Sequence, residues 1–185
     1  NGANLGRVAE VNQLSRQIEN GAYTLEQVRQ ELKRIQHLPD FPETLQIAAA
    51  GFSGASFSYL FGGGWQDALC TVGIGILLYL YLLKIGKPHF SKIVCNILGS
   101  AWVTFLSIFC HRIFPSTHLE SMLVGGIIIM VPGVAFTNAI RDMADGDYIS
   151  GSVRMLDAIL VFFCIAMGVG FMMALYSGMM SGGFL

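Results

Sequence analysis

Charged residues are scarce in this sequence. Asp, Glu, Lys and Arg make up 12% of the 185 residues, whereas hydrophobic residues make up 54%. A soluble globular domain usually carries about 25% charged residues, so the composition excludes an ordinary soluble protein. The net charge of -1 gives no information about nucleic acid, but no basic patch interleaved with aromatic residues is present. We therefore expect no nucleic-acid partner.

The sequence also lacks the motifs of metal centres and of common enzymes. Its four cysteines are dispersed without a C-x-x-C pair, which favours packing over a disulfide or metal role. The four histidines have no partners at the spacing of zinc ligands. No Ser-His-Asp set, phosphate-binding loop or dinucleotide fingerprint is present. We expect no metal, no cofactor and no enzymatic activity.

Long apolar runs dominate the chain after Pro42. A helix that crosses a membrane needs roughly 20 mainly apolar residues. The runs predict an all-α membrane protein with about five transmembrane helices, at about 45–61, 65–83, 93–114, 119–140 and 150–176. The 22 glycines fit helices that pack closely in lipid through small residues.

Residues 1–42 are the part that resembles a soluble protein. Apolar residues recur at helical spacing up to Ile18, and Asn20-Gly21 interrupts the pattern. Thr24 to Gln27 has the sequence of a capping box, from which a second amphipathic helix starts. Pro39 and Pro42 end the segment. We expect a short cytoplasmic helical hairpin over 1–42 and a membrane domain over 43–185.

Basic residues are distributed asymmetrically over the predicted spans. If the spans alternate, Arg112 alone falls on one side of the membrane. The other side receives Arg7, Arg16, Arg29, Lys33, Arg34, Lys84, Lys87, Lys92, Arg141 and Arg154. Because cytoplasmic loops are rich in Lys and Arg, we expect a cytoplasmic N-terminus and a C-terminus outside. An odd number of spans without an internal repeat favours half of a transporter.

A polar stretch from residue 131 to 158 lies between two strongly apolar runs. Its Pro132-Gly133 pair falls near mid-membrane in the 119–140 run and predicts a kink or a break. A break would free backbone groups for a polar ligand, whereas a simple kink is an equal alternative. Beyond it, four polar residues share one helical face, with Thr137 beside them: Asn138, Arg141, Asp142 and Asp145. For Arg141 and Asp142, near the interface, snorkelling or a loop role is the alternative.

A turn is predicted where these two runs meet. Gly146 is suited to cap the C-terminus of the first helix, and Asp147 or Ser150 to cap the start of the next. For Asp145, Gly146 and Asp147 we favour this structural role over a functional one.

Asp157 has the most unusual position predicted for a charge. In a helix that starts near Ser150 it lies about 10 Å along the axis, well inside the hydrocarbon. A carboxylate at that depth is costly and is a functional candidate by default. Arg154 lies three residues earlier on the same face, so simple pairing of the two is the alternative.

The polar stretch resembles a known family signature. The segment P-G-V-A-F-T-N-A-I-R-D-M-A-D-G-D-Y-I-S-G-S-V-R-M-L-D-A is similar to the N-terminal membrane domain of the bacterial threonine/serine exporter family. The G-G-G-W-Q-D motif from Gly62 to Asp67 and the helical lead-in carry the same resemblance. It implies a secondary exporter of the bacterial cytoplasmic membrane. Family members either fuse this half to a second membrane domain or use a separate small membrane subunit, and some split systems are associated with succinate export. We expect the split type.

These features together favour one subunit of a proton-coupled exporter of small carboxylates, either threonine/serine-type amino acids or a dicarboxylate such as succinate. Its expected partners are the lipid bilayer and a second small membrane subunit, in a homo- or hetero-oligomer. The candidate pathway residues are Thr137, Asn138, Arg141, Asp142, Arg154 and Asp157. An Arg would hold the substrate carboxylate, and Asp157 or Asp142 the proton. The alternative is a non-transporting membrane scaffold or regulatory subunit.

Overall fold

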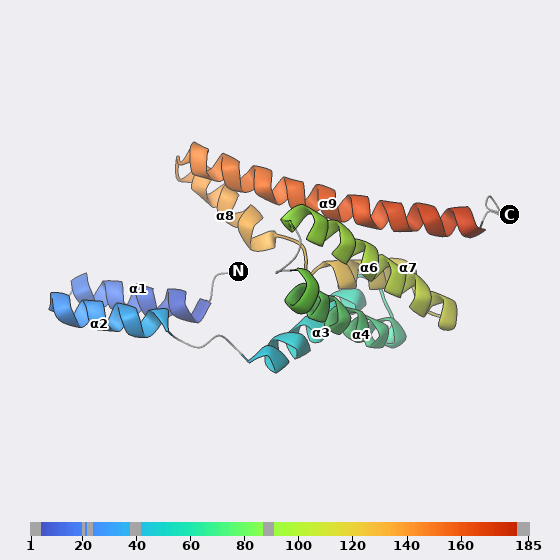
Figure 1. Cartoon of the computed structure of the whole chain (residues 1–185), viewed down its shortest axis with the longest axis horizontal. Coiled ribbons are helices and arrows are strands. Elements are labelled where there is room, and N and C mark those ends of the chain that lie inside the picture. The colour runs from blue at the N-terminus through green and yellow to red at the C-terminus, as the bar shows by residue number, and fades with distance from the viewer. Residues whose placement is uncertain (1–4, 20, 22–23, 38–41, 87–90, 181–185) are drawn as a thin grey trace. The chain divides into compact units, whose positions relative to one another are not determined.

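The structure is a computed structural model that describes residues 5–19, 21, 24–37, 42–86 and 91–180 (Figure 1). These residues form eight α-helices and a short π-helical segment, and they contain no strand. The all-α prediction is therefore confirmed for the described residues. Asn20, Pro39 and Lys87, which the sequence analysis used, lie outside them. The chain divides into two units, residues 1–43 and 44–185.

The first unit is a helical hairpin. Helices α1 (Leu5–Glu19) and α2 (Leu25–Gln36) pack on each other and bury Leu14 and Ile35. The backbone N–H of Thr24 donates to Gln27 Oε1 at 2.9 Å, which closes the predicted capping box at the start of α2. Gly21, at φ 69°, adopts the left-handed conformation between the two helices.

The second unit contains the long apolar helices. Its elements are α3 (Glu43–Leu60), α4 (Trp65–Tyr81), η1 (Leu82–Gly86), α6 (Lys92–Ile113), α7 (Leu119–Ile127), α8 (Gly133–Ala144) and α9 (Tyr148–Met180). Within the described residues, three segments are long and apolar enough to cross a membrane: 65–84, 92–113 and 148–180. Helix α3 and the α7–α8 stretch are not among them, so these two predicted spans stay predictions.

Helices α6 and α9 form the main packing contact of this unit and run parallel (Figure 1). Near the start of α6, Lys92 contacts Asp157 of α9. Near the end of α6, the Arg112 guanidinium lies 5.6 Å from the centre of the Tyr176 ring. Between these levels the backbones approach so closely at Gly168 that a Cβ there would collide with Ser100 Oγ and Ile97 O. The α6–α9 contact therefore depends on glycine at position 168.

The chain is not helical between α7 and α8. Helix α7 ends at Ile127, α8 begins at Gly133, and the segment between them makes short turn bonds, such as Met130 N–H to Ile127 O at 2.8 Å. Pro132 has φ -81° and ψ 52°, which is not a helical conformation. Met130 is buried in the core with Ile74, Leu78, Val103, Val161 and Ile165. The structure thus has a break, rather than a kink, in the 119–140 run.

A tight turn joins α8 to α9. Gly146 has φ 89°, and Asp147 N–H donates to Asp142 O at 2.9 Å across the end of α8. Asp147 Oδ1 accepts a hydrogen bond from Ser150 N–H at 3.2 Å and so caps the start of α9. Helix α8 then lies along α9, where the rings of Phe136 and Phe162 meet edge to face at 6.0 Å.

Candidate functional site

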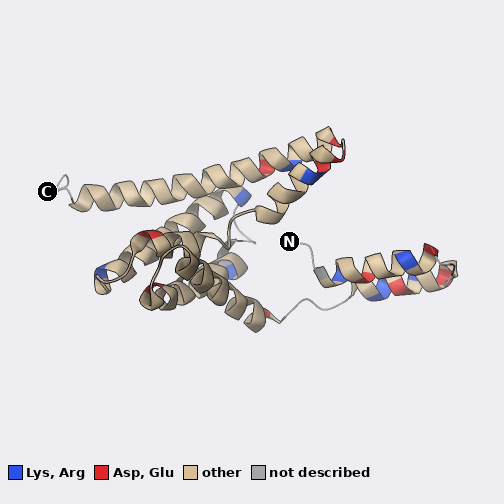
Figure 2. Ribbon diagram, turned by 180° about the vertical axis from the view of Figure 1, so that it is seen from behind, with Lys and Arg blue, Asp and Glu red and all other residues tan. Residues whose placement is uncertain are grey.

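Several charges of the second unit gather where α8 and α9 meet, while others lie on α4, η1, α6 and α7 and the rest of α9 is free of charge (Figure 2). The Arg154 Nε lies 3.3 Å from Asp142 Oδ2, which links the two helices. This contact lacks hydrogen-bond geometry, so the buried Asp142 Oδ2 has no hydrogen bond within the described residues. Arg141 and Asp145 form a looser pair on the exposed surface of α8, at 3.9 Å. Of the predicted pathway residues, Arg154 and Asp142 thus contact each other across the α8–α9 turn.

Asp157 has a different partner from the one that the sequence suggested. Lys92 Nζ lies 2.6 Å from Asp157 Oδ1 and 2.5 Å from Oδ2, while Arg154 contacts Asp142 on α8. Pairing of Asp157 with Arg154 is therefore wrong. Side chains three residues apart on one helix can form a pair. Here Arg154 and Asp157 each pair instead with an opposite charge on a neighbouring helix, and the spacing of residues along one helix does not reveal such contacts.

The same contact changes the expected depth of Asp157. Lys92 is the first residue of α6, so Asp157 lies level with the start of that helix. From Lys92 to Arg112 is 20 residues, or about 30 Å of helix, which is the thickness of the hydrocarbon core. If these two charged levels mark the two edges of the membrane, Asp157 lies at one edge. Its depth in the membrane stays a prediction, and its side chain is half exposed.

The remaining predicted residues lie on α8. Thr137 is exposed, and its hydroxyl donates to Gly133 O at 2.9 Å, within the helix. Asn138 is half-buried, and its side-chain amide makes no hydrogen bond to a described residue. At the start of α8, Pro132 provides no side-chain cap. The backbone N–H groups of Val134 and Ala135 also have no acceptor in the described part of the chain. The break therefore leaves donors available at a helix N-terminus.

A second polar cluster, at the start of α4, was not predicted. Asp67 is only 1% exposed and accepts hydrogen bonds from Gly64 N–H and His118 N–H, both at 2.7 Å. His118 Nδ1 lies 3.0 Å from Asp67 Oδ2. Asp67 thus connects the α3–α4 turn to the start of α7. The sequence does contain a signal for this cluster, because Asp67 is the third residue of a helix that follows three glycines, which is a capping pattern. Above, the same G-G-G-W-Q-D motif carried only the family resemblance.

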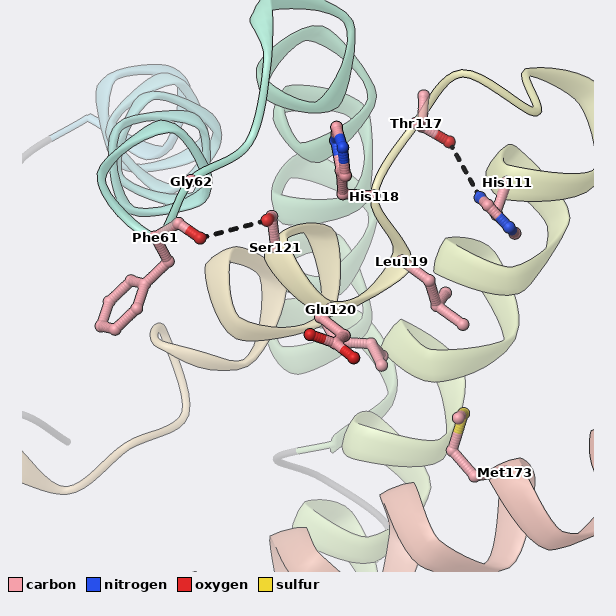
Figure 3. Close-up of a pocket in the computed structure, with 10 residues that line it drawn as sticks. Phe61, Gly62, His111, Thr117, His118, Leu119, Glu120, Ser121 and Met173 are labelled. Atoms are coloured by element: carbon pink, nitrogen blue, oxygen red, sulfur yellow. Dashed lines mark hydrogen bonds between the residues drawn. The ribbon is translucent and has the colours of Figure 1, made fainter.

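A pocket of about 590 Å³ opens beside this cluster (Figure 3). It is lined by Phe61, Gly62, His111, Thr117, His118, Leu119, Glu120, Ser121, Leu123 and Met173. The Ser121 hydroxyl donates to Phe61 O at 3.2 Å, which ties α7 to the end of α3 (Figure 3). His111 Nδ1 contacts Thr117 Oγ1 at 3.3 Å. The lining residues of the pocket come from α6, α7, α9, the α3–α4 turn and the α6–α7 connection, so periodicity along the chain could not reveal the pocket.

Acidic, cysteine and histidine side chains do not converge on a metal site. Within the described residues, no group of three or more of them is placed to hold an ion. The chemistry that the two polar regions offer is therefore ion pairing, hydrogen bonding and proton binding.

Comparison with known proteins gives a family match over almost the whole chain. The family model described as "Putative threonine/serine exporter" matches residues 1–176. The "Threonine/serine exporter" of Corynebacterium glutamicum is 24% identical over 176 residues, which cover 90% of this chain and 35% of that protein. The chain thus spans about a third of that relative's length.

Two relatives carry the name of a transporter subunit. The "Probable succinate transporter subunit YjjP" of Escherichia coli K12 is 27% identical over 176 residues, covering 94% of this chain and 67% of that protein. The protein of the same name from Klebsiella aerogenes is 27% identical over 179 residues, covering 95% and 68%. No solved structure matches the chain.

Proposed function

This chain belongs to the threonine/serine exporter family, and on that basis we propose that it is one subunit of a secondary transporter. It exports small carboxylate metabolites, threonine/serine-type amino acids or a dicarboxylate such as succinate, across the bacterial cytoplasmic membrane. Export is coupled to protons. A second small membrane subunit completes the pathway, in keeping with the subunit names of two relatives. The N-terminal hairpin lies in the cytoplasm.

The observation that supports this proposal most is the break between α7 and α8. In a membrane, unpaired backbone groups are tolerated only where protein or a water-filled cavity satisfies them. The N–H groups of Val134 and Ala135 are such groups. Secondary transporters use interrupted helices in this way, because the positive end of a half-helix attracts an anionic group of the substrate.

The charged residues support a pathway that starts at the cytoplasmic edge. The pairs Lys92–Asp157 and Arg154–Asp142 connect α6, α8 and α9 at this level. A substrate carboxylate can compete with Asp142 for Arg154, and a proton on Asp157 would release Lys92. Arg141, Thr137 and Asn138 lie on the same helix as Asp142 and extend the polar path towards the break. The substrate-binding and proton-binding roles of these individual residues are predictions.

Export in bacterial cells tests the proposal. Cells that produce the chain with its second subunit should release serine, threonine or succinate faster than cells that lack both, measured as internal and external concentrations. If both kinds of cell released serine, threonine and succinate at the same rates, the export proposal would be contradicted.

The scaffold role and the transport role predict different accessibility of α8 and α9 to water-soluble reagents. If α8 and α9 line a cavity, a cysteine at position 138 or 157 reacts with a water-soluble thiol reagent in the assembled transporter. If partner side chains fill the α8–α9 surface, both positions are unreactive and the scaffold role is favoured.

A further inference from the structure

One face of α6 carries a row of exposed aromatic side chains. Trp102, Phe105 and Phe109 are exposed, and their rings stack in sequence, with centroids 5.8 Å and 6.5 Å apart. Spacings of three and four residues place the three rings on one side of the helix. The buried residues of α6 follow the other side: Gly99, Ser100, Val103, Thr104 and Ser107. The three rings therefore lie outside the core of this unit.

Arg112 continues this row in the last turn of α6, three residues beyond Phe109. Its guanidinium lies 5.6 Å from the centre of the Tyr176 ring of α9, and its Nη2 lies 2.8 Å from Met180 Sδ. These contacts hold the guanidinium beside α9 without neutralising it, because a thioether is a weak acceptor and the ring has no net charge. Within the described part of the chain, no carboxylate pairs with Arg112.

The position of Arg112 decides which anion can reach this charge. Residues 92–113 are long and apolar enough to cross a membrane, and in a spanning helix the last turn lies near the bilayer surface. The phosphate groups of phospholipids lie at that level. A guanidinium suits them, because its planar fork can donate two parallel hydrogen bonds to phosphate oxygens.

The aromatic row fits the apolar part of a phospholipid. From Trp102 to Arg112 is 10 residues, or about 15 Å of helix, which is half the thickness of the hydrocarbon core. The acyl chains of one leaflet cover the same depth. An acyl chain that starts from a phosphate at Arg112 therefore passes Phe109 and Phe105 and ends near Trp102.

A neighbouring protein is the competing occupant of this face. Helices that pack in membranes meet through small residues, which let their backbones approach. Helix α6 uses such residues against α9, where Gly168 approaches Ser100, whereas the exposed row contains only large rings. A protein that covered the row would also withdraw Arg112 from water, which is costly unless the protein supplies a carboxylate. These features favour a lipid.

We propose that the row of Trp102, Phe105, Phe109 and Arg112 binds one anionic phospholipid, with the headgroup phosphate on Arg112 and an acyl chain along the three rings. A headgroup with a net negative charge is preferred, because the ammonium group of a zwitterionic headgroup already neutralises its phosphate. This site goes beyond the proposed export function and does not depend on the identity of the exported substrate.

Quenching of Trp102 fluorescence by brominated lipids tests this inference. The chain has two tryptophans, so Trp65→Phe leaves Trp102 as the single fluorophore. The full chain is reconstituted in phosphatidylcholine vesicles, in which brominated phosphatidylglycerol or brominated phosphatidylcholine replaces part of the lipid. We expect phosphatidylglycerol to bind beside Trp102 at least threefold more tightly than phosphatidylcholine. Equal quenching by both lipids would overturn the proposal. Quenching by neither would show that protein covers the row and would overturn it as well.

Variants of the same single-tryptophan chain identify the headgroup site. Arg112→Gln should bind both lipids equally beside Trp102, whereas Arg112→Lys keeps the charge and should retain a smaller preference for phosphatidylglycerol. Lys84→Gln removes one positive charge from an exposed position of η1 and is the matched control, which should keep the full preference. A full preference in Arg112→Gln would exclude Arg112 from the site, and its loss in Lys84→Gln would show that overall charge, rather than this row, attracts the lipid.

Discussion

Asp67 is a buried carboxylate whose oxygens accept three hydrogen bonds from groups of two connecting segments. Gly64 N–H comes from the α3–α4 turn, while the backbone and ring N–H groups of His118 come from the α6–α7 connection. A buried charge without partners costs several kcal/mol, so each of these donors matters for the folded state. Asp67 therefore fixes the two connecting segments that border the pocket lined by Gly62 and His118.

Replacing Asp67 by Asn should destabilise the protein by about 2–4 kcal/mol. The amide nitrogen of Asn cannot accept the hydrogen bonds that Oδ1 or Oδ2 accepts, so at least one buried donor loses its partner. Thermal unfolding of the purified chain in detergent measures the effect. Asp145→Asn, at an exposed position of α8, is the control and should unfold almost like the unmodified chain. Equal unfolding temperatures for both variants would show that Asp67 is not an anchor.

Asp157 should matter for transport more than for stability. Its pair with Lys92 is about half exposed, and exposed pairs contribute only about 0–1 kcal/mol. We expect Asp157→Asn to leave thermal unfolding nearly unchanged and to reduce export at least tenfold, because it cannot bind and release a proton. Export at the normal rate in this variant would remove Asp157 from the mechanism.

At the scale of elements, close helix packing and the interrupted helix are the two features that matter most. Gly168 allows α6 and α9 to touch, whereas a Cβ at Gly170, two residues further, would meet no atom within 4 Å. Pro132 lies at the end of the non-helical segment, and a Cβ at Gly133 would likewise meet no atom within 4 Å. Gly170 is therefore the control position for the close packing at Gly168, and Gly133 is the control position for the break at Pro132.

Gly168→Ala should destabilise the chain by about 1–3 kcal/mol, because overpacking forces the α6 and α9 backbones apart. Gly170→Ala should be neutral or stabilise by up to about 1 kcal/mol, since alanine favours the helix. Unfolding in detergent compares the two. A similar effect of both substitutions would mean that the close α6–α9 approach does not contribute to stability.

Pro132→Ala tests the break. Proline disfavours a helix interior by about 3 kcal/mol, so its removal favours continuous helix from α7 into α8. We expect export to fall at least tenfold while thermal stability is kept or rises, because the free N–H groups of Val134 and Ala135 become paired within the helix. Gly133→Ala should export normally. A Pro132→Ala variant with normal export would show that the break is not needed.

At the scale of the whole molecule, much of the fold could be predicted from the sequence. Apolar runs of spanning length gave the helices that begin at Trp65 and Lys92 and the final one, because hydrophobicity over about 20 residues is a local property. The capping sequence at Thr24 likewise located the start of α2. The contacts between side chains on different helices could not be predicted from the sequence. Asp157 contacts Lys92 and Asp67 contacts His118 across 65 and 51 residues, and these distances depend on how the helices pack.

The orientation predicted from the basic residues, with a cytoplasmic N-terminus, can be measured directly. In a variant without native cysteines, Ser116→Cys in the α6–α7 connection should react with an impermeant maleimide added to intact cells. Ser152→Cys, exposed near the start of α9, should react only after the membrane is permeabilised. The reverse result would place the α6–α7 connection, and the pocket beside Asp67, on the cytoplasmic side.

Helix α9 is one unbroken helix of 33 residues, or about 50 Å, which is roughly 20 Å more than the hydrocarbon core. Its closest backbone approach to α6, at Gly168, lies between Arg154 near one end and Met173, which lines the pocket beside Asp67, near the other. Contacts also hold α9 on either side of this point, through the Arg154–Asp142 pair and the Arg112–Tyr176 contact. Because α9 is a single rigid helix, a tilt about Gly168 would displace its two ends in opposite directions and so disturb the Arg154–Asp142 pair and the Met173 side of the pocket together.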